Sequence, residues 1–368
     1  GFAYDYLATF EELPEVKPGA NTYPDYEFLV AQTVLAVDHL QGTAHLEGWD
    51  IDDKRLREEL DSLASLPAAA RSAAPQKEKI RAVTDVDDAG FRAGVDKLKG
   101  NIHAGDIYQV VPARAFTVDC PNALAAYRAL RETNPSPYMF YLRGADYELF
   151  GASPESNLKF APKDRQVQLY PIAGTRPRGL NPDGSINHEL DIRNELDMRT
   201  DQKEIAEHTM LVDLARNDLA RVAVPRSRQV AELLHVDRYS RVMHLVSRVT
   251  ATLHPDFDAL DAYRACMNMG TLTGAPKLRA TELVRRTEGK RRGSYGGAVG
   301  YLRGDGAMDN CIVIRSAYVQ DGTAVVQAGA GVVKDSVPQA EADETVHKAY
   351  AVLHAIAMAH GAELEVQR

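Results

Sequence analysis

The feature that most constrains the fold is the mixing of tight turns with long helical stretches. Residues 294–333 contain two turn signals, Gly304-Asp305-Gly306 and Asp321-Gly322, each between apolar runs. Glycine and aspartate tolerate the positive φ that hairpin turns require, so this stretch predicts an antiparallel meander. Because strands and helices do not alternate regularly along the chain, the pattern favours an α+β fold over a doubly wound parallel sheet.

Three helices can be placed from apolar spacing and capping residues. Apolar side chains recur at helical spacing between residues 91 and 102, and Thr84 or Asp85 is the expected cap. Residues 201–219 and 336–360 predict two more helices, each beginning at a residue whose side-chain oxygen can accept from a free backbone N–H.

The composition excludes several classes of protein. Of the 368 residues, 45% are apolar and 26% charged, as in an ordinary globular protein, and the net charge is −9. The acidic balance argues against a nucleic-acid partner, and no apolar run reaches membrane-spanning length. The cysteines, Cys120, Cys266 and Cys311, lie far apart, so they predict neither a disulfide framework nor a zinc site and fit a reducing cytoplasm.

The start of the chain and one biased segment predict the domain organisation. The sequence opens with Gly1-Phe2, without an initiator methionine or a signal-peptide pattern, as if it began inside a fold. Residues 68–79 are rich in Ala, Ser, Lys and Pro and predict a linker in a mobile loop. We expect residues 1–80 to be the remainder of an N-terminal region with its linker, and residues 81–368 to be the main domain.

Two pairs of glutamates are the clearest candidates for chemistry. Glu204 and Glu207, and likewise Glu341 and Glu344, lie three residues apart within predicted helices, and Lys348 follows the second pair. This spacing places each pair on one helical face. Spacing alone favours two solvated faces. The alternative is a divalent-cation site, because Mg²⁺ prefers oxygen ligands and often takes only one or two carboxylates.

Three further motifs have competing interpretations. Residues 171–179 combine a tight turn with Arg176 and Arg178, which suits a carboxylate ligand or a solvated loop. Residues 328–332 lack the third glycine of a dinucleotide fingerprint, so they indicate bare backbone near an anion or a strand glycine that eases packing. His244 lies in an apolar stretch, where a hydrogen-bonded core histidine is commoner than a catalytic one.

Several segments, in one order, carry a resemblance that none of them carries alone. These segments are Gly105-Asp106-Ile107-Tyr108-Gln109-Val110-Val111-Pro112, Asn134-Pro135-Ser136-Pro137-Tyr138-Met139, Gly151-Ala152-Ser153-Pro154-Glu155, Pro171-Ile172-Ala173-Gly174-Thr175, residues 207–218, 271–277, 293–301 and 328–332, Ile312-Val313-Ile314-Arg315, and Glu341 with Glu344. Together they resemble the family of chorismate-utilising enzymes, and within it the large subunits (component I) of anthranilate synthases, over essentially the whole chain.

The resemblance implies a fold, a reaction and a cofactor. The implied fold is α+β, with antiparallel sheets packed face to face and helices outside. Such enzymes add ammonia to C2 of chorismate, expel the 4-hydroxyl and eliminate pyruvate to give anthranilate, the first committed step of tryptophan biosynthesis. The family binds Mg²⁺ on the ring carboxylate. Residues 81–368 would then be the chorismate-binding catalytic domain, and residues 1–80 what remains of a regulatory region.

The resemblance also assigns site residues, position by position. Glu207 and Glu344 match the acids that hold Mg²⁺, with Glu204 and Glu341 in support. Glu155 matches the general acid that protonates the departing hydroxyl. The other matches are Thr175 and Thr271 near the ring, His244 as a residue that helps pyruvate elimination, and a set around the substrate carboxylates that comprises Tyr295, Arg315, Gly329, Gly331 and Lys348.

Two positions separate the branches of this family. Gln109 stands where isochorismate and salicylate synthases have a lysine that activates water, and an amide cannot act as that base. Ala173 stands where aminodeoxychorismate synthases have a nucleophilic lysine. Both favour ammonia as nucleophile. The alternatives are a 2-amino-2-deoxyisochorismate synthase, which stops before pyruvate loss, and a non-catalytic subunit that binds chorismate or tryptophan.

The resemblance also implies partners. None of the three cysteines has the surroundings of an amidotransferase nucleophile, so we expect a separate glutamine amidotransferase subunit to supply ammonia. Family members bind tryptophan as a feedback inhibitor, and Pro137, Tyr138 and Met139 match part of that pocket. The Leu-Leu-Glu-Ser-type segment that completes the pocket is not found in this sequence, so we expect the chain to lack the N-terminal segment of the family.

Overall fold

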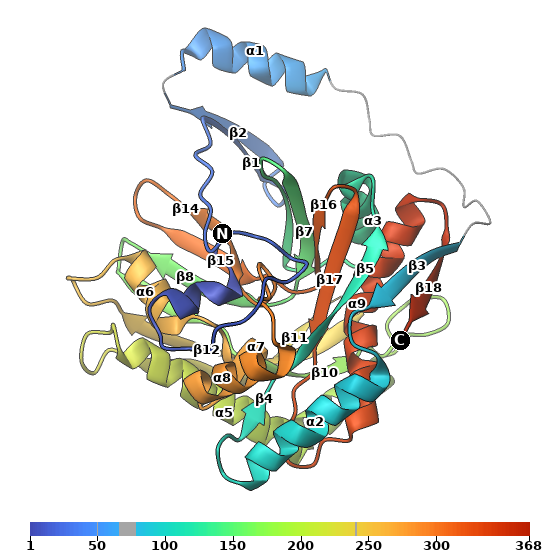
Figure 1. Cartoon of the computed structure of the whole chain (residues 1–368). Coiled ribbons are helices and arrows are strands. Elements are labelled where there is room, and N and C mark those ends of the chain that lie inside the picture. Colours follow the sequence, from blue (N-terminus) through green and yellow to red (C-terminus); the bar gives the residue numbers. More distant parts are fainter. Residues whose placement is uncertain (50, 66–78, 240) are drawn as a thin grey trace. The chain divides into compact units, whose positions relative to one another are not determined.

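The computed structural model describes residues 1–49, 51–65, 79–239 and 241–368 (Figure 1). By its contacts the chain divides into two compact units, Glu27–Ala74 and a larger one of Gly1–Tyr26 with Pro75–Arg368. Residues 68–78 of the expected linker lie outside the described residues. The boundary expected after residue 80 stays a prediction, although residues 1–26 make their contacts within the larger unit.

The smaller unit is a hairpin followed by a helix. Strands β1 (Thr33–Asp38) and β2 (Thr43–Gly48) pair antiparallel, and α1 (Asp53–Ala64) follows. The Asp38 carboxylate accepts from two N–H groups of the turn, and Gly42 has a φ of 66°. Gln41 and Gly42 therefore lie in the turn that joins the two strands.

In the described residues, the larger unit contains two seven-stranded sheets. The first sheet has the order β10-β12-β9-β8-β15-β14, with β11 also paired to β12, and is antiparallel throughout. Its strands are β8 (Ser156–Ala161), β9 (Gln166–Leu169), β10 (Ile172–Pro177), β11 (Gln229–Arg238), β12 (Val242–Thr252), β14 (Ala298–Leu302) and β15 (Met308–Ile312).

The second sheet has the order β18-β3-β5-β17-β16-β7-β6, and β18 with β3 is its parallel pair. Its strands are β3 (Lys79–Thr84), β5 (Ala113–Asp119), β6 (Tyr138–Arg143), β7 (Tyr147–Ser153), β16 (Ser316–Gln320), β17 (Thr323–Gly329) and β18 (Glu363–Gln367). A short antiparallel ribbon of β4 (Gln109–Val110) and β13 (Gly274–Ala275) lies outside both sheets.

The helices of the larger unit belong to different sheets. Helices α5 and α6 contact the first sheet, and α3 and α9 contact the second (Figure 1). Helix α4 also contacts the first sheet, at β10 and β12. The described helices are η1 (Tyr4–Thr9, a 3₁₀ turn), α2 (Asp88–His103), α3 (Ala123–Thr133), α4 (His188–Thr200), α5 (Gln202–Ala220), α6 (Ala259–Cys266), α7 (Gly270–Thr273), α8 (Lys277–Glu288) and α9 (Pro338–Ala359). None of these described helices is both long enough and apolar enough to traverse a bilayer.

The two sheets pack through their inner faces. Leu149 and Tyr318 of the second sheet share an apolar cluster with Val299 and Cys311 of the first. Side chains alternate between the faces of a strand, so Phe150, next to Leu149, packs instead with α3 and α9. The predicted α+β fold, with antiparallel sheets face to face and helices outside, is confirmed.

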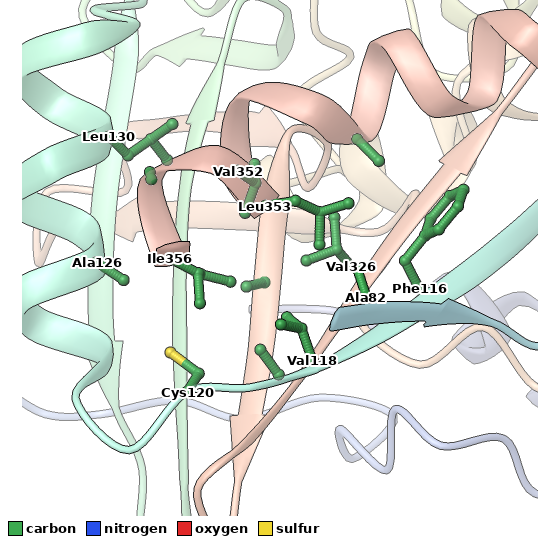
Figure 2. Close-up of a cluster of buried hydrophobic side chains, with 14 of the residues drawn as sticks. Ala82, Phe116, Val118, Cys120, Ala126, Leu130, Val326, Val352, Leu353 and Ile356 are labelled. Atoms are coloured by element: carbon green, nitrogen blue, oxygen red, sulfur yellow. The ribbon is translucent and has the colours of Figure 1, made fainter. Parts of the chain in front are cut away.

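The last helix is fixed by an apolar face along its C-terminal half. Figure 2 shows Val352, Leu353 and Ile356 of α9 beside Val118 of β5 and Val326 of β17. Each fully buried side chain of this size contributes about 1.5–3 kcal/mol to stability. The N-terminal turns of α9 can therefore present polar residues elsewhere.

The meander predicted over residues 294–333 is wrong as a single sheet. Both predicted turns close hairpins, but β14–β15 belongs to the first sheet and β16–β17 to the second. The chain crosses between the sheets at Arg315, whose φ is 49°, an uncommon backbone for a residue other than glycine. Turn signals predict hairpins, but they do not say which sheet each hairpin joins.

The predicted caps have mixed outcomes. Asp201 caps α5 as predicted, since its carboxylate accepts from the N–H of Lys203 and of Glu204. Ser336 does not cap α9, because its hydroxyl accepts from the N–H of Val333 and the helix starts at Pro338.

The cap predicted for α2 is also wrong. The carboxylate of Asp87 caps this helix by accepting from Gly90 N–H. Thr84 still belongs to β3, and the Asp85 carboxylate accepts from Ala115 N–H of β5 instead. Strand pairing therefore occupies both of the predicted capping residues.

Candidate active site

One cavity of about 440 Å³ collects the predicted site. It is lined by residues of both sheets and of helices α5 and α9. Every residue assigned by resemblance to catalysis, substrate or metal lies in its wall, namely Gln109, Glu155, Thr175, Glu204, Glu207, His244, Thr271, Tyr295, Arg315, Gly329, Gly331, Glu341, Glu344 and Lys348. Their individual roles stay predictions.

Glu155 lies in the turn between β7 and β8 and is 6% exposed. The Thr271 hydroxyl donates to its Oε1 at 2.9 Å. Burial raises the pKa of Glu155 to about 8, and the Thr271 hydrogen bond and the Lys348 charge lower it only in part. A carboxyl with this pKa is protonated at neutral pH and can donate a proton to a ligand in the cavity.

Four glutamates form a second feature of the cavity, which we call the carboxylate wall (Glu204, Glu207, Glu341 and Glu344). Helix α5 presents the first pair and α9 the second. Burial raises the pKa of Glu207, and the charges of the other three glutamates raise it further against the opposing charge of Lys203. Burial also raises the pKa of Glu341, whose buried Oε2 has no hydrogen-bond partner in the described residues. The wall thus has an excess of negative charge.

The wall fits a divalent cation held partly by a ligand. A cation would relieve the repulsion among the glutamates and satisfy the free Glu341 oxygen. Within the described ranges, no three His, Cys, Asp or Glu side chains converge closely enough to hold a metal ion by themselves. Mg²⁺ often takes one or two protein carboxylates and completes its shell with substrate and water, so the donor set suits Mg²⁺ better than a closed structural site.

The interpretation of residues 171–179 as a binding loop for a carboxylate ligand is wrong, because carboxylates of the chain itself already occupy the Arg176 guanidinium. This guanidinium pairs with Asp197 at 2.7 Å, with Asp201 at 3.1 Å and with Glu204 at 2.9 Å. Arg178 is likewise occupied, because it contacts both carboxylate oxygens of Asp191, at 2.8 and 3.2 Å. Both arginines therefore hold α4 and the start of α5 against the first sheet.

The partners of these arginines come mainly from α4, which was not predicted. This helix has no apolar stripe at helical spacing, and Ile192 and Leu196 are both at least 60% exposed. Its carboxylates could not be placed beside the loop from spacing alone.

Besides Lys203, the cavity that contains the carboxylate wall is lined by two further basic residues, Arg315 and Lys348. The Lys348 ammonium lies 2.5 Å from Glu344 Oε1 and donates to the Gly329 carbonyl at 3.0 Å. Arg315 is partly buried, and its Nη1 donates to the Lys348 carbonyl at 3.1 Å. Tyr295 stays a neutral phenol, because burial raises its pKa to about 12. The cavity can thus receive a substrate with carboxylates next to a bound cation.

His244 faces the cavity and is not a core residue. It lies opposite Thr175 on neighbouring strands, and Nδ1 shares a hydrogen bond with the Thr175 hydroxyl at 2.9 Å. Burial lowers the pKa of His244, and the charge of Arg315 lowers it further. A neutral imidazole in this place can take up a proton.

Gln109 and two glycines meet at another part of the wall. Gln109 is buried on β4, and its Oε1 lacks a hydrogen-bond partner in the described part of the chain. A Cβ on Gly331 would lie 2.9 Å from Gln109 Nε2, and one on Gly329 would lie 2.8 Å from the Pro112 carbonyl. Close packing against the backbone therefore requires a glycine at position 329, whereas a Cβ at position 331 would only push against the end of the Gln109 side chain.

Two polar residues that line the cavity, Lys203 and Gln327, were not predicted from the sequence. Lys203 precedes Glu207 by four residues on α5, and Gln327 precedes Gly329 by two on β17. The helix and strand periods could have found both, because each shares a face with a residue already chosen.

The residues assigned to tryptophan binding lie elsewhere. Pro137 directly precedes β6, which contains Tyr138 and Met139, and none of the three lines the cavity. The Tyr138 hydroxyl donates to the Asp309 carboxylate at 2.9 Å. Their role as an inhibitor site stays a prediction.

The sequence matches a known family over almost its whole length. The pattern of the family described as "chorismate binding enzyme" covers residues 1–354. The chain therefore belongs to the family of chorismate-binding enzymes.

Its relatives place it more narrowly. Anthranilate synthase component 1 of Salmonella typhimurium is 55% identical, over 98% of this chain and 71% of that protein. The protein of the same name from Vibrio cholerae is 54% identical, over 98% and 70%. The solved structure of anthranilate synthase component I from Streptococcus pneumoniae has a TM-score of 0.84 and 33% identity, and it covers 95% of this chain and 79% of that one. The predicted resemblance to these large subunits is confirmed.

Proposed function

We propose that this chain is an anthranilate synthase large subunit, which converts chorismate and ammonia to anthranilate, pyruvate and water. The observation that carries the proposal is one cavity in which a buried, protonatable Glu155 lies with the carboxylate wall and with the basic side chains of Arg315 and Lys348. Chorismate offers groups that suit each part: two carboxylates, a 4-hydroxyl leaving group and an enolpyruvyl ether. The identity to anthranilate synthase large subunits supports the same reaction.

Substrate binding is assigned to the charged residues. Arg315 and Lys348 receive the substrate carboxylates, with Tyr295 and the bare backbone at Gly329 and Gly331 beside them. Glu207 and Glu344 would hold Mg²⁺, with Glu204 and Glu341 in support. The cation, when bound, neutralises the ring carboxylate of the substrate and offsets charge that develops during the reaction.

Glu155 acts as the general acid for the first chemical step. Ammonia forms a bond to C2 while the bond between C4 and its hydroxyl breaks, and the hydroxyl leaves as water with the proton of Glu155. Thr271 holds Glu155 Oε1 and so fixes the direction in which the proton is presented. His244, neutral and held by Thr175, is placed to take the C2 proton as the ether bond between C3 and the enolpyruvyl oxygen breaks. The released enolpyruvate takes up one proton at its methylene carbon and becomes pyruvate, so the proton count balances.

The nucleophile is ammonia, supplied by a separate glutamine amidotransferase subunit. Gln109 is an amide that cannot activate water as a base, and Ala173 has no nucleophilic group. The chain's own cysteines do not suit amidotransfer, because burial raises the pKa of the Cys120 and Cys311 thiols to about 12 and that of Cys266 as well. These free, buried thiols also support a cytoplasmic location.

The test is to incubate the full chain with chorismate, Mg²⁺ and ammonium at alkaline pH. Anthranilate fluorescence with an equal amount of pyruvate supports the proposal. Accumulation of 2-amino-2-deoxyisochorismate without pyruvate would assign the enzyme that stops at that intermediate. Chorismate binding without turnover would assign a non-catalytic subunit.

A further inference from the structure

The largest fully buried side chains of the described residues are two arginines, Arg114 and Arg292. They are 1% and 2% exposed, and neither lines the cavity. Burying a charge is costly, and an apolar replacement of a buried ion pair is often neutral or stabilising. Their contacts point instead to a role in orientation.

Arg114 holds the polar end of α9. Its Nε donates to the Thr345 hydroxyl at 2.8 Å, and its Nη2 donates to the Ala342 carbonyl at 2.9 Å. These two residues directly follow Glu341 and Glu344 of the carboxylate wall. The apolar face in Figure 2 fixes the C-terminal half of the helix, so Arg114 supplies the matching constraint at its start.

The far side of Arg114 is anchored in α2 and its entry. Nη2 pairs with the Asp88 carboxylate at 2.8 Å, and Nη1 donates to the Val86 carbonyl at 3.0 Å. The guanidinium also lies over the rings of Phe91 and Phe116, at 5.1 and 5.4 Å. A planar fork with fixed donors can set the rotation of α9, which a flexible lysine could not.

Arg292 holds a different part of the cavity lining, outside the carboxylate wall. Nη1 donates to the Leu272 carbonyl at 2.8 Å, directly after Thr271, and Nη2 donates to the Val111 carbonyl at 2.6 Å, two residues after Gln109. Its guanidinium lies 5.5 Å from the Tyr295 ring. The buried Glu288 carboxylate pairs with it at 2.6 Å. The Arg292 side chain thus contacts the backbone near Thr271 and Gln109 as well as the ring of Tyr295.

We propose that Arg114 and Arg292 are positioning residues that divide the site between them. Arg114 fixes the orientation of Glu341 and Glu344, the α9 half of the carboxylate wall. Arg292 fixes the part of the cavity lining that orients Glu155 and the nucleophile. This division rests on the proposed function, but its cation half can be measured without turnover.

The experiment compares Arg114→Lys with Arg292→Lys in the full chain. Arg165→Lys is the matched control, since Arg165 also binds backbone carbonyls, those of Leu253, His254 and Phe257, but lies away from the cavity. The readouts are Mn²⁺ binding followed by the loss of the free-ion EPR signal, the Mg²⁺ concentration for half activation, kcat with chorismate and ammonium, and the melting temperature.

Opposite patterns are expected from the two variants. Arg114→Lys should weaken Mn²⁺ binding and raise the half-activating Mg²⁺ concentration about tenfold, with kcat at saturating Mg²⁺ within about twofold of wild type. Arg292→Lys should leave Mn²⁺ binding within about twofold and lower kcat by about ten- to a hundredfold. Arg165→Lys should change neither. If both arginine variants lose Mn²⁺ binding and kcat together, in step with melting temperature, the division is overturned.

Milder variants cover the case in which a lysine variant does not fold. Thr345→Val removes the hydroxyl that receives Arg114 Nε and should weaken Mn²⁺ binding alone, by about threefold. Glu288→Gln loosens Arg292 and should lower kcat alone. Lowered kcat in the first variant or weakened Mn²⁺ binding in the second would contradict the proposal. A wild-type chain that binds Mn²⁺ but makes no anthranilate would refute the proposed function and leave the Arg114 test readable.

Discussion

Glu155 and the carboxylate wall are the same kind of side chain in two environments of one cavity. Glu155 is buried with a hydroxyl as its hydrogen-bond donor, and no carboxylate of the described residues contributes to the shift of its pKa. The four glutamates of the wall lie near one another and near Lys203, Lys348 and Arg176. Burial alone raises the pKa of Glu155, whereas at Glu207 the charges of the other glutamates add to the effect of burial, and a bound cation would relieve that repulsion. The difference shows that surroundings, not residue type, assign the roles of acid and ligand.

The largest expected effect comes from removing the acidic proton of Glu155. Glu155→Gln keeps the shape and the Thr271 hydrogen bond but removes the proton to be donated. We expect kcat to fall by about 10²–10⁴, the usual contribution of a general acid, while chorismate still binds. Steady-state kinetics and a binding titration measure the two effects. Near-normal turnover would remove Glu155 from the acid role.

A substitution in the carboxylate wall should weaken the binding of the cation. Glu344→Gln removes one charge from α9, so we expect about a ten- to a hundredfold weaker response to Mg²⁺ together with lower activity. Asp343→Asn is the matched control, because Asp343 precedes Glu344 on the same helix and pairs with Arg368 outside the cavity. An unchanged Mg²⁺ titration in Glu344→Gln would exclude this residue as a ligand.

A substitution at Gln109 tests which nucleophile the cavity accepts. Gln109→Lys places an amine where this chain has an amide with a free oxygen. We expect ammonia-dependent turnover to fall about tenfold, and water to compete as nucleophile. Chromatography of the products would show isochorismate or salicylate. If neither forms, the preference for ammonia rests on more than this position.

A last expected effect concerns the pH dependence of stability. The pKa of Glu155 is raised to about 8 from 4.5, so between these values the folded state binds a proton that the unfolded state has lost. Folding stability therefore falls across this window by about 1.4 kcal/mol per pH unit from this group alone. Glu155→Gln lacks this loss, so its melting temperature should gain on wild type as pH rises from 5 to 8. A constant difference would contradict the raised pKa.

The fold was predictable where local signals act alone. Hairpin turns at Gly306 and Gly322 and the cap at Asp201 follow from short-range chemistry. The crossing at Arg315, which sends consecutive hairpins to different sheets, depends on tertiary packing and left no signal in spacing.

The site shows the same limit. Helical spacing placed Glu341 and Glu344 on one face, but it could not distinguish a cavity wall from a solvated face. Arg176 and Arg178 looked free to bind a ligand because their carboxylate partners lie 13 to 28 residues later in the chain. The residues assigned by resemblance all line one cavity, because a family pattern carries information on contacts between distant segments, which periodicity within one element does not contain.

The most direct measurement is the infrared spectrum of the folded chain at neutral pH, compared between wild type and Glu155→Gln. A protonated carboxyl has a carbonyl stretch separate from that of a carboxylate. We expect the wild type to show such a band, with an intensity that drops in Glu155→Gln and that falls in the wild type as pH rises through about 8. Glu344→Gln should retain it. A wild-type spectrum without this band would contradict the assignment of Glu155 as the neutral acid opposite a charged carboxylate wall.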